Sequence, residues 1–434
     1  MTDTQNLYQY FLKAEARVYT DTRKIDRNKP GLFFALSGDN FNGNHFAAAA
    51  IEQGCPYAVI DDPAYVNGPQ TLLVSDCLKS LQALASHHRQ QMKAEIIAIT
   101  GSNGKTTTKE LLYAVLTQAH HVVATQGNYN NHIGVPLTLL RIKQIHDYAI
   151  VELGTNSHGE IRFLSEMSDP DYGLITSIGK AHLEGLGSVE GVAKEKLSLF
   201  SYLIAKKAPV FHQESNPWIR SYFADRKYND RIVFDIYHGP NFSINIRELF
   251  PAIKATVNSE GKRYTIHSEL FGQYNLLNIV AAVSIGCYFR VSMENCLKAI
   301  NSLKLSNNRT EKLNWKGATI FLDAYNANPS SVKEAVTAFA KTELEHKWLI
   351  LGDMYELGLE EIKEHQAIIN LVTQSSWTQV VFIGEIYLQA KIPDSYLKFR
   401  DFADCYEWFQ EISVLGAHIL IKASRGMALE RLLL

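Results

Sequence analysis

The sequence predicts an α/β fold in three domains, and three observations support that prediction. Short apolar runs typical of buried strands alternate with segments of helical spacing along most of the chain. Such alternation indicates parallel sheets with helices on both faces. The chain has 434 residues, which corresponds to about three domains at roughly 150 residues each. We expect boundaries near residues 90 and 305, so the domains span 1–90, 91–305 and 306–434.

The first domain and the start of the central domain show the alternation clearly. In the first domain, strands are expected in the apolar segments 32–35, 58–60 and 71–74. In the central domain, the run EIIAIT at 95–100 predicts a buried strand, and the apolar spacing over 106–118 predicts a helix. Further strands are expected at 121–125, 148–153 and 171–178.

The pattern changes between about residues 232 and 270, where we expect antiparallel strands with a turn at 259–261. Two helices should follow, at 274–289 and 292–303. After about residue 306 the alternation resumes, which predicts a second, independent α/β unit. Its strands are expected at 318–323, 348–351, 379–383 and 418–421, and its helices at 331–340, 361–373 and 403–412.

The composition excludes several classes of protein. Basic and acidic residues number 43 and 45, for a net charge of −2, so no overall field attracts polyanions and neither nucleic acid nor a membrane surface is expected as a partner. The five cysteines form no C-x-x-C pair, which predicts reduced thiols. No signal-peptide pattern and no run of about 18 apolar residues is seen. We therefore expect a cytoplasmic protein.

The strongest local signal is ITGSNGKTTT at 99–108, which follows a predicted strand and opens a predicted helix. Glycines let the backbone approach phosphate oxygens, and the first amides of a helix point toward a bound anion. A lysine adds charge at the β and γ phosphates, and a Thr hydroxyl is a Mg²⁺ ligand. We expect the ATP-binding residues to be Gly101, Ser102, Asn103, Gly104, Lys105, Thr106 and Thr107. Ile99 stands where the standard pattern has Gly, so the loop is a shortened variant; the alternative is a Gly-rich turn with an incidental lysine.

The segment TGSNGKTTTKELL resembles the phosphate loop of the Mur ligases, ATP-dependent amide-forming enzymes of peptidoglycan precursor synthesis. Other segments resemble the MurF branch, which adds D-alanyl-D-alanine, and they follow in the family's order: GNYNNHIGVPLTLL, VELGTNSHGEI, ITSIGKAHLEGLGSVEGVAKEK, LDAYNANPSSVKEAV and LGDMYELG. The segment at 21–46 is similar to the family's domain for the uridine nucleotide. The S-S-H and DNPR segments typical of the MurE branch are absent from the sequence.

The resemblance implies an architecture and a reaction. The three domains would be an N-terminal domain for the nucleotide sugar, a central phosphate-loop ATPase domain and a C-terminal Rossmann-like domain. With ATP and Mg²⁺, the enzyme would convert the carboxylate of UDP-MurNAc-tripeptide to an acyl phosphate, which the amine of D-alanyl-D-alanine attacks. We expect a monomer that acts on these small molecules. Whether the third residue of the peptide is diaminopimelate or lysine stays open.

The resemblance also implies catalytic and metal-binding residues. Glu152, which ends the strand VELG, and His182, in the segment HLEG, match Mg²⁺ ligands of the family. Lys196 matches a lysine that is carbamylated in several Mur ligases and helps to hold a second Mg²⁺, and Arg309 matches an arginine that acts on the phosphates. The expected metal ligands are thus Thr106, Glu152, His182 and Lys196, and the expected catalytic residues are Lys105, Lys196, His182 and Arg309. Each of these residues also has a simpler alternative. Taken alone, Glu152 would more often be a solvated turn residue and His182 a hydrogen-bonded histidine without a metal. Lys196 would more often be a solvated helical lysine and Arg309 a linker arginine.

Binding residues follow from the same comparison of motifs. Asn275 and Asp323 match nucleotide contacts of the family. The expected substrate-binding residues are Asn130, Asn131, Tyr325, Asn326, Asn328 and Arg425, with Thr22, Arg23, Asn42 and Asn44 for the uridine nucleotide. The asparagines are also common turn formers.

Two alternatives to this function remain at the sequence level. The chain could be another Mur-type amide ligase, similar to MurE or to folylpolyglutamate synthase. It could also be a phosphate-loop NTPase that works as a switch or a motor and forms no amide bond.

Overall fold

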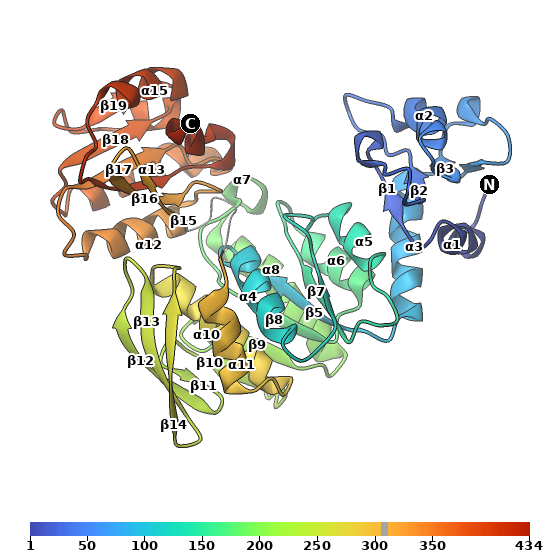
Figure 1. Ribbon diagram of the computed structural model, residues 1–434, viewed down its shortest axis with the longest axis horizontal. Coiled ribbons are helices and arrows are strands. Elements are labelled where there is room, and N and C mark those ends of the chain that lie inside the picture. The colour runs from blue at the N-terminus through green and yellow to red at the C-terminus, as the bar shows by residue number, and fades with distance from the viewer. Residues whose placement is uncertain (305–310) are drawn as a thin grey trace.

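The computed structural model describes residues 1–304 and 311–434, and within them the strands form four sheets (Figure 1). Arg309, which is expected to be catalytic, lies outside the described residues. No helix in the described part of the chain is long and apolar enough to cross a lipid bilayer.

The N-terminal unit is a small parallel sheet in the order β1-β2-β3-β4. The three predicted strands are confirmed to within one residue, whereas β1 has only two residues and was not predicted. The elements are α1 (Thr4–Lys13), β1 (Val18–Tyr19), η1 (Thr22–Lys24), β2 (Leu32–Phe34), η2 (Gly43–Phe46), α2 (Ala47–Glu52), β3 (Tyr57–Ile60), η3 (Pro63–Tyr65), β4 (Thr71–Leu73) and α3 (Cys77–Gln91).

The central unit contains a six-stranded parallel sheet in the order β10-β9-β8-β5-β7-β6. Its elements are β5 (Glu95–Thr100), α4 (Lys105–Leu116), β6 (Val122–Ala124), α5 (Gly134–Leu139), β7 (Tyr148–Glu152), α6 (Glu160–Ser168), β8 (Tyr172–Ile175), α7 (Leu183–Leu186), α8 (Val189–Ala205), β9 (Val210–Gln213), α9 (Pro217–Ala224) and β10 (Arg231–Phe234). The predicted strands and the predicted helix of this region are all present.

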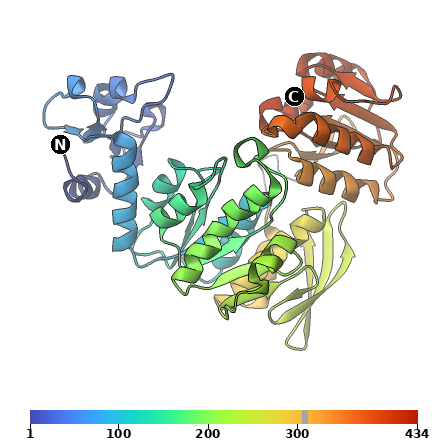
Figure 2. The same cartoon turned by 180° about the vertical axis from the view of Figure 1, so that it is seen from behind.

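The central strand β5 explains why this sheet is covered on both faces. Ile97 and Ile99 pack with α4 and α10, whereas Ile96 and Ala98 belong to the opposite core with α6 and α8. Successive side chains of a strand point to opposite faces, so an unbroken apolar run needs two helical layers. Figure 1 shows α4 and α10 in front of the sheet, and Figure 2 shows the long helix α8 on the other side.

An antiparallel sheet, β11-β12-β13-β14, follows the central sheet and confirms the predicted change of pattern. Ser259 pairs with Lys262 across the predicted turn. The start of this region was placed too early, because residue 232 lies in β10, which pairs in parallel with β9. The elements are β11 (His238–Gly239), β12 (Phe242–Glu248), β13 (Ile253–Ser259), β14 (Lys262–Ser268), α10 (Gln273–Tyr288) and α11 (Met293–Ser302).

The C-terminal unit is a second α/β sheet, in the order β15-β16-β20-β17-β18-β19, and only β15 is antiparallel to its neighbour. Its predicted strands and helices are confirmed, and β15 and β19 were not predicted. The elements are β15 (Glu311–Trp315), β16 (Ala318–Asp323), α12 (Pro329–Ala340), β17 (Lys347–Gly352), η4 (Gly358–Glu360), α13 (Glu361–Val372), β18 (Gln379–Ile383), α14 (Glu385–Leu388), β19 (Leu397–Phe399), α15 (Phe402–Glu411), β20 (His418–Lys422), η5 (Arg425–Met427) and η6 (Leu429–Leu433).

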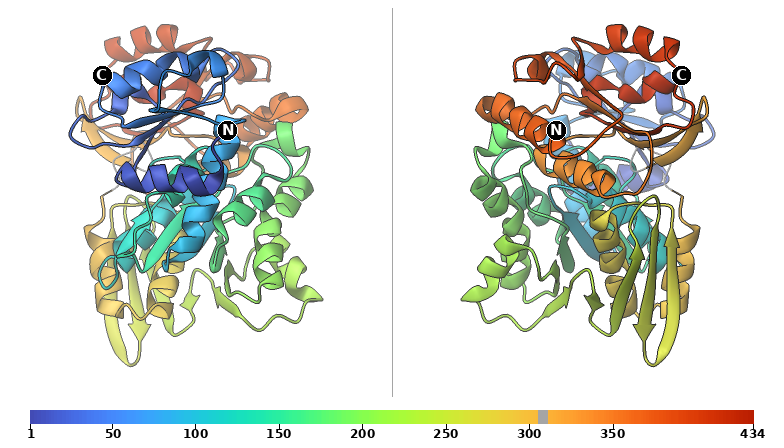
Figure 3. Two further views of the ribbon diagram at one scale, coloured as in Figure 1. Left: turned by 90° about the vertical axis from the view of Figure 1, so that its right-hand side faces the viewer. Right: turned by 90° about the vertical axis from the view of Figure 1, so that its left-hand side faces the viewer.

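The N-terminal and C-terminal units lie on the same side of the central unit, and the antiparallel sheet lies on the opposite side (Figures 1 and 3). Aromatic rings fix the C-terminal unit at its contact with the antiparallel segment. The ring of Phe250 lies 4.5 Å from that of Phe321 on β16 and 4.8 Å from that of Phe271, measured between centroids. Aromatic pairs at such distances add to the free energy gained by burial.

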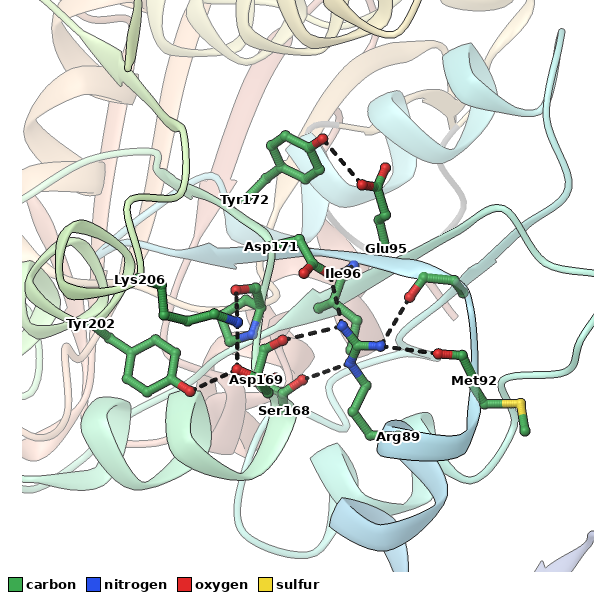
Figure 4. A network of polar contacts seen from close by, with 12 residues as sticks. Arg89, Met92, Glu95, Ile96, Ser168, Asp169, Asp171, Tyr172, Tyr202 and Lys206 are labelled. Atoms are coloured by element: carbon green, nitrogen blue, oxygen red, sulfur yellow. Dashed lines mark hydrogen bonds and ion pairs between the residues drawn. The ribbon is translucent and has the colours of Figure 1, made fainter. Parts of the chain in front are cut away.

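Arg89 joins the N-terminal unit to the central sheet (Figure 4). Its buried guanidinium donates to the carbonyl oxygens of Ser168 and Asp169, each at 3.2 Å, and to Oδ2 of Asp171 at 2.7 Å. The same Asp171 oxygen accepts from the backbone N–H of Ile96 at 2.8 Å. One side chain at the end of α3 therefore holds the start of β5 and the turn between α6 and β8.

Candidate active site

A cavity of about 280 Å³ lies at the carboxyl ends of β5 and β7, where the central unit faces the C-terminal unit. Ligands of open α/β sheets bind at this edge. The lining combines most of the predicted site residues with several others: Ser102, Asn103, Gly104, Lys105, Thr106, Thr107, Asn128, Asn130, Glu152, Gly154, Thr155, Asn156, His182, Tyr274, Asn275, Asn278, Asp323, Tyr325, Asn326, Asn328, Ser331, Glu334 and Lys422.

The predicted phosphate loop connects β5 to α4 and requires glycine at the helix start. Gly104 has a φ of 81°, in the left-handed region. A Cβ atom at this position would lie 2.5 Å from Oδ1 of Asn278 on α10. Both the backbone conformation and the close approach exclude other residues. The Nζ of Lys105 donates to the carbonyl of Gly101 at 2.6 Å, so the lysine folds over its own loop inside the cavity.

Asn103 anchors this loop on two sides. Its backbone N–H donates to Oγ of Ser177 at 2.8 Å, and its carbonyl accepts from Oγ1 of Thr176 at 2.6 Å. Its side-chain Oδ1 accepts from Nδ2 of Asn328 at 2.8 Å, and Asn328 is the N-cap of α12 in the C-terminal unit. The phosphate loop is thus hydrogen-bonded directly to the C-terminal unit.

Glu152 is 1% exposed and organises the floor of the cavity. Its Oε2 accepts from the hydroxyl of Thr106 at 2.8 Å, and its Oε1 accepts from Nδ2 of Asn130 at 2.8 Å. The alternative of a solvated turn residue is therefore wrong. A buried carboxylate beside a Thr hydroxyl at a phosphate loop offers the oxygen donors that Mg²⁺ prefers.

The donor set as a whole fits a Mg²⁺ ion that is shared with a phosphate chain. Within residues 1–304 and 311–434, no group of three His, Cys, Asp or Glu side chains is close enough to hold a metal unaided. Magnesium at phosphate sites uses one or two carboxylates together with water and phosphate oxygens. Thr106, Glu152 and His182 line the same cavity and meet that requirement.

His182 begins the short helix α7 with a φ of 51°, and its ring contacts the C-terminal unit. Its Nδ1 lies 2.6 Å from Oε2 of Glu356. This contact, and to a smaller extent the charges of His182 and Lys105, lowers the pKa of Glu356 against the opposing effect of burial. Nearby, the backbone N–H of Lys180 donates to Oγ of Ser330 at 3.0 Å.

Lys196 is 1% exposed on α8, so the alternative of a solvated lysine is wrong. Burial lowers its pKa well below the usual value, and the charge of Lys105 lowers it further. Lys196 does not line the cavity itself, whereas Lys105 does. The neighbouring Lys194 is exposed, which supports the choice of Lys196 from the sequence.

Asn275 and Asn278 lie on one face of α10 and bond to each other, with Nδ2 of Asn278 3.1 Å from Oδ1 of Asn275. Both are buried at the cavity wall. Nδ2 of Asn275 also donates to the carbonyl of Phe271 at 2.9 Å. Asn275 therefore lies at the cavity wall near the start of this helix, and its contact with a nucleotide stays a prediction.

Asp323 ends β16 and pairs with a residue that sequence reasoning missed. The Nζ of Lys422, which is 2% exposed, lies 2.6 Å from Oδ2 of Asp323. The two residues are neighbours because Asp323 pairs with Lys422 in the register of β16 and β20. Sequence reasoning also missed Thr155, Asn156, Ser331 and Glu334; the first two directly follow the quoted VELG, which was the available signal.

Three of the predicted residues lie beside the cavity. Gly101 presents its carbonyl to Lys105. Oδ1 of Asn131 accepts from the backbone N–H of Gly134 at 2.9 Å, at the start of α5. Arg425 pairs with Glu430 at 3.1 Å.

The predicted uridine-nucleotide residues lie in the N-terminal unit. Thr22 and Arg23 belong to η1, and Arg23 pairs with Asp21 at 2.9 Å. Asn42 caps η2, and the amide of Asn44 donates to Asp61 at 2.8 Å. These positions stay predictions as binding residues.

A second cavity, of about 1170 Å³, separates the N-terminal unit from the edge strand β6. Asp21 and Lys24, which flank Thr22 and Arg23, line it on one side. Gln126 and Gly127 line it on the other and lead directly into Asn128 of the first cavity. The loop that follows β6 therefore contributes lining residues to both cavities.

The fold and the cavity define a nucleotide-binding α/β protein of the phosphate-loop class. A family model described as the Mur ligase middle domain matches residues 99–286, and one described as the Mur ligase glutamate ligase domain matches residues 308–425. The chain is 34% identical to the UDP-N-acetylmuramoyl-tripeptide–D-alanyl-D-alanine ligase of Bacillus subtilis (strain 168), over 96% of this chain and 92% of the relative. It is 32% identical to the Escherichia coli (strain K12) enzyme of that name, over 95% and 92%.

Solved structures agree with these relatives. The structure resembles a crystal structure of MurF from Acinetobacter baumannii, with a TM-score of 0.84, 26% identity and coverage of 96% of this chain and 92% of the other. MurF from Thermotoga maritima in complex with ADP shares the fold, with a TM-score of 0.82, 23% identity and 96% coverage of each chain. The chain belongs to the Mur ligase family and is an ATP-dependent ligase. The expected family, fold class and enzyme class are confirmed.

Proposed function

We propose that this chain joins D-alanyl-D-alanine to UDP-MurNAc-tripeptide at the expense of ATP, as a cytoplasmic monomer in peptidoglycan precursor synthesis. The relatives of that name, matched over nearly the whole chain, support this function. The observation that carries it is one cavity shared by the phosphate loop and the polar ends of β16 and β20. Such a cavity can hold a triphosphate, a carboxylate and an amine together.

The phosphate loop has the first task, phosphoryl transfer. Lys105 and the amides at the start of α4 stabilise the negative charge on the phosphates as the γ-phosphoryl group moves to the substrate carboxylate. Asn275 and Asp323, which line the cavity, are proposed to contact the nucleotide, and Arg309 belongs to this proposal by its motif. Thr106, Glu152, His182 and a carbamylated Lys196 would hold Mg²⁺, which supplies charge neutralisation at the phosphates.

Amide formation follows in the same cavity. The amine attacks the carbonyl carbon of the acyl phosphate and loses a proton, and inorganic phosphate leaves through a tetrahedral intermediate. Asn130, Tyr325, Asn326 and Asn328 line the cavity and are proposed to orient the peptide and the dipeptide. Asn131 and Arg425, beside it, complete the proposed set.

The N-terminal unit is proposed to bind the uridine nucleotide, near the second cavity, which Asp21 and Lys24 line. Thr22, Arg23, Asn42 and Asn44 are the proposed contacts in an N-terminal domain of residues 1–90. The central ATP-binding domain would span 91–305 and the C-terminal domain 306–434, so that each domain contributes one reactant to the junction.

The identity of the amine tests the proposed function. Purified protein is given UDP-MurNAc-tripeptide, ATP and Mg²⁺ with either D-alanyl-D-alanine, D-alanine, diaminopimelate or lysine, and products are separated by mass. We expect ligation with the dipeptide alone, because a site that pairs polar groups of a dipeptide leaves them unmatched with a single amino acid. Product with a single amino acid and none with the dipeptide would assign the chain to another branch. ATP hydrolysis without either substrate would favour a switch or motor.

Carbamylation of Lys196 has its own test. The neutral amine that carbon dioxide needs is favoured by burial. Lys196→Ala should lose most activity, and short carboxylic acids should restore part of it, while the exposed Lys194→Ala remains active. A ¹³C signal of a carbamate after addition of labelled bicarbonate, absent in Lys196→Ala, is expected; an identical spectrum for both proteins would reject the modification.

A further inference from the structure

Glu356 of the segment LGDMYELG contacts His182 from another unit of the molecule. The carboxylate Oε2 lies 2.6 Å from Nδ1 of the His182 ring. The carbonyl of the same Glu356 accepts from the backbone N–H of Glu184 at 3.1 Å. One residue of the C-terminal unit therefore contacts both the ring and the backbone of the segment that begins α7.

The next two residues of that segment make the double contact possible. Leu357 is 2% exposed and anchors the turn in the core. Gly358 has a φ of 55°, and a Cβ atom there would lie 3.3 Å from Cα of Glu184. The backbone of η4 thus approaches α7 as closely as a glycine permits.

The backbone conformation of the two residues in this contact indicates a functional role more than a stabilising one. His182 and Glu356 both have positive φ, 51° and 64°, a region that non-glycine residues seldom adopt. Such conformations gather at functional sites. The side chain of Glu356 is 49% exposed, and ion pairs at that exposure stabilise a fold little.

The contact decides which ring nitrogen is available to a ligand. Because Nδ1 faces the carboxylate of Glu356, Nε2 is the ring nitrogen that is left for a ligand. Metal-bound histidines in proteins are commonly held in this way by a carboxylate on the other nitrogen. His182 lines the cavity with Thr106 and Glu152.

We propose that Glu356 is a positioning residue that fixes the His182 ring for the metal, so that the metal site is complete only when the C-terminal unit is docked. This inference rests on the proposed role of His182 as a metal ligand. Docking is supported by the Asn103–Asn328 contact, the ion pair of Lys180 with Glu364 and the aromatic contact of Phe250 with Phe321.

Manganese is the probe for the test, because its electron spin reports directly on nitrogen ligands. Mn²⁺ and a non-hydrolysable ATP analogue are added to the full-length wild type, Glu356→Gln, His182→Asn and Glu360→Gln. Glu360→Gln is the matched control, since Glu360 lies in the same turn and pairs with Lys363. Mn²⁺ affinity is measured by electron paramagnetic resonance, and bound nitrogen by the ¹⁴N modulation of the spin echo. Analogue affinity without metal is measured by calorimetry.

We expect the wild type and Glu360→Gln to show the ¹⁴N modulation and His182→Asn to lack it. Glu356→Gln should bind Mn²⁺ about tenfold more weakly with reduced modulation, while its unfolding temperature and its metal-free affinity for the analogue match the control. Equal Mn²⁺ affinity and modulation in Glu356→Gln and the wild type would overturn the role of Glu356 and leave the metal role of His182 intact. Absence of modulation in the wild type would overturn both, whereas ligase activity, measured separately, tests the proposed reaction.

Discussion

Replacement of Lys105 by Met separates catalysis from folding in the phosphate loop. The Nζ of Lys105 makes a hydrogen bond to Gly101 within the loop, and the loss of such a bond should lower the free energy of unfolding by about 1 kcal/mol. Removing a group that stabilises developing charge typically costs about 3–4 kcal/mol in the transition state. At about 1.4 kcal/mol per decade, kcat should fall on the order of 10²- to 10³-fold.

Lys109→Met, four residues further along α4, is the contrasting variant. Lys109 is fully buried and donates to the carbonyls of Thr125 at 2.7 Å and Gly127 at 3.2 Å. Its loss leaves buried acceptors unmatched and should lower the free energy of unfolding by about 2–4 kcal/mol. Kinetics are followed by ADP release in the ligation mixture, and stability by urea unfolding. Two results would refute the reasoning. The first is a kcat of Lys105→Met near that of the wild type, and the second is a free energy of unfolding of Lys105→Met as low as that of Lys109→Met.

Three further predictions follow from the structure. Gly104→Ala should weaken ATP binding at least tenfold by calorimetry, because its Cβ would meet Asn278 at 2.5 Å; unchanged affinity would contradict the loop geometry. Lys422→Met should lower the free energy of unfolding by about 3 kcal/mol by leaving Asp323 unpaired, and the added change Asp323→Leu should restore part of it; additive losses in thermal unfolding would argue against the pair. Burial lowers the pKa of His212 to about 4, so the unfolded chain binds more protons between about pH 6.5 and 4 and stability falls with falling pH. The pKa of a histidine in the unfolded chain is about 6.5, and the difference from about 4 corresponds to up to about 3 kcal/mol. Between these two pH values, the wild type should lose that much more free energy of unfolding than His212→Phe in urea unfolding. Parallel plots of unfolding free energy against pH for the two proteins would exclude this cause.

The parallel strands of the central and C-terminal sheets could be predicted from the sequence because they are buried on both faces. The runs EIIAIT and ATIFLD are short and mostly apolar, which is typical of strands that are buried on both faces. The short edge strand β1 and the polar edge strand β15 carry no such signal. Their positions depend on neighbours distant in the sequence.

The same limit applies to the site. The phosphate loop lies within a single motif, so local residues sufficed to predict it, whereas Glu152 was predicted from the family resemblance of its segment. Lys422 reaches Asp323 only through the register of two strands that are 99 residues apart. The contact of Glu356 with His182 joins two units whose docking no local pattern specifies. Long-range contacts of this kind need the fold before they can be seen.

Transfer of a labelled oxygen is the most direct test of the central claim, an acyl phosphate made in this cavity. UDP-MurNAc-tripeptide with ¹⁸O in its reactive carboxylate is incubated with D-alanyl-D-alanine, ATP and Mg²⁺, and inorganic phosphate is analysed by mass spectrometry. The carboxylate oxygen that attacks the γ-phosphorus stays with the phosphate when the amine displaces it. The account predicts one ¹⁸O atom in phosphate for each amide bond formed, and phosphate without the label beside a labelled amide product would contradict it.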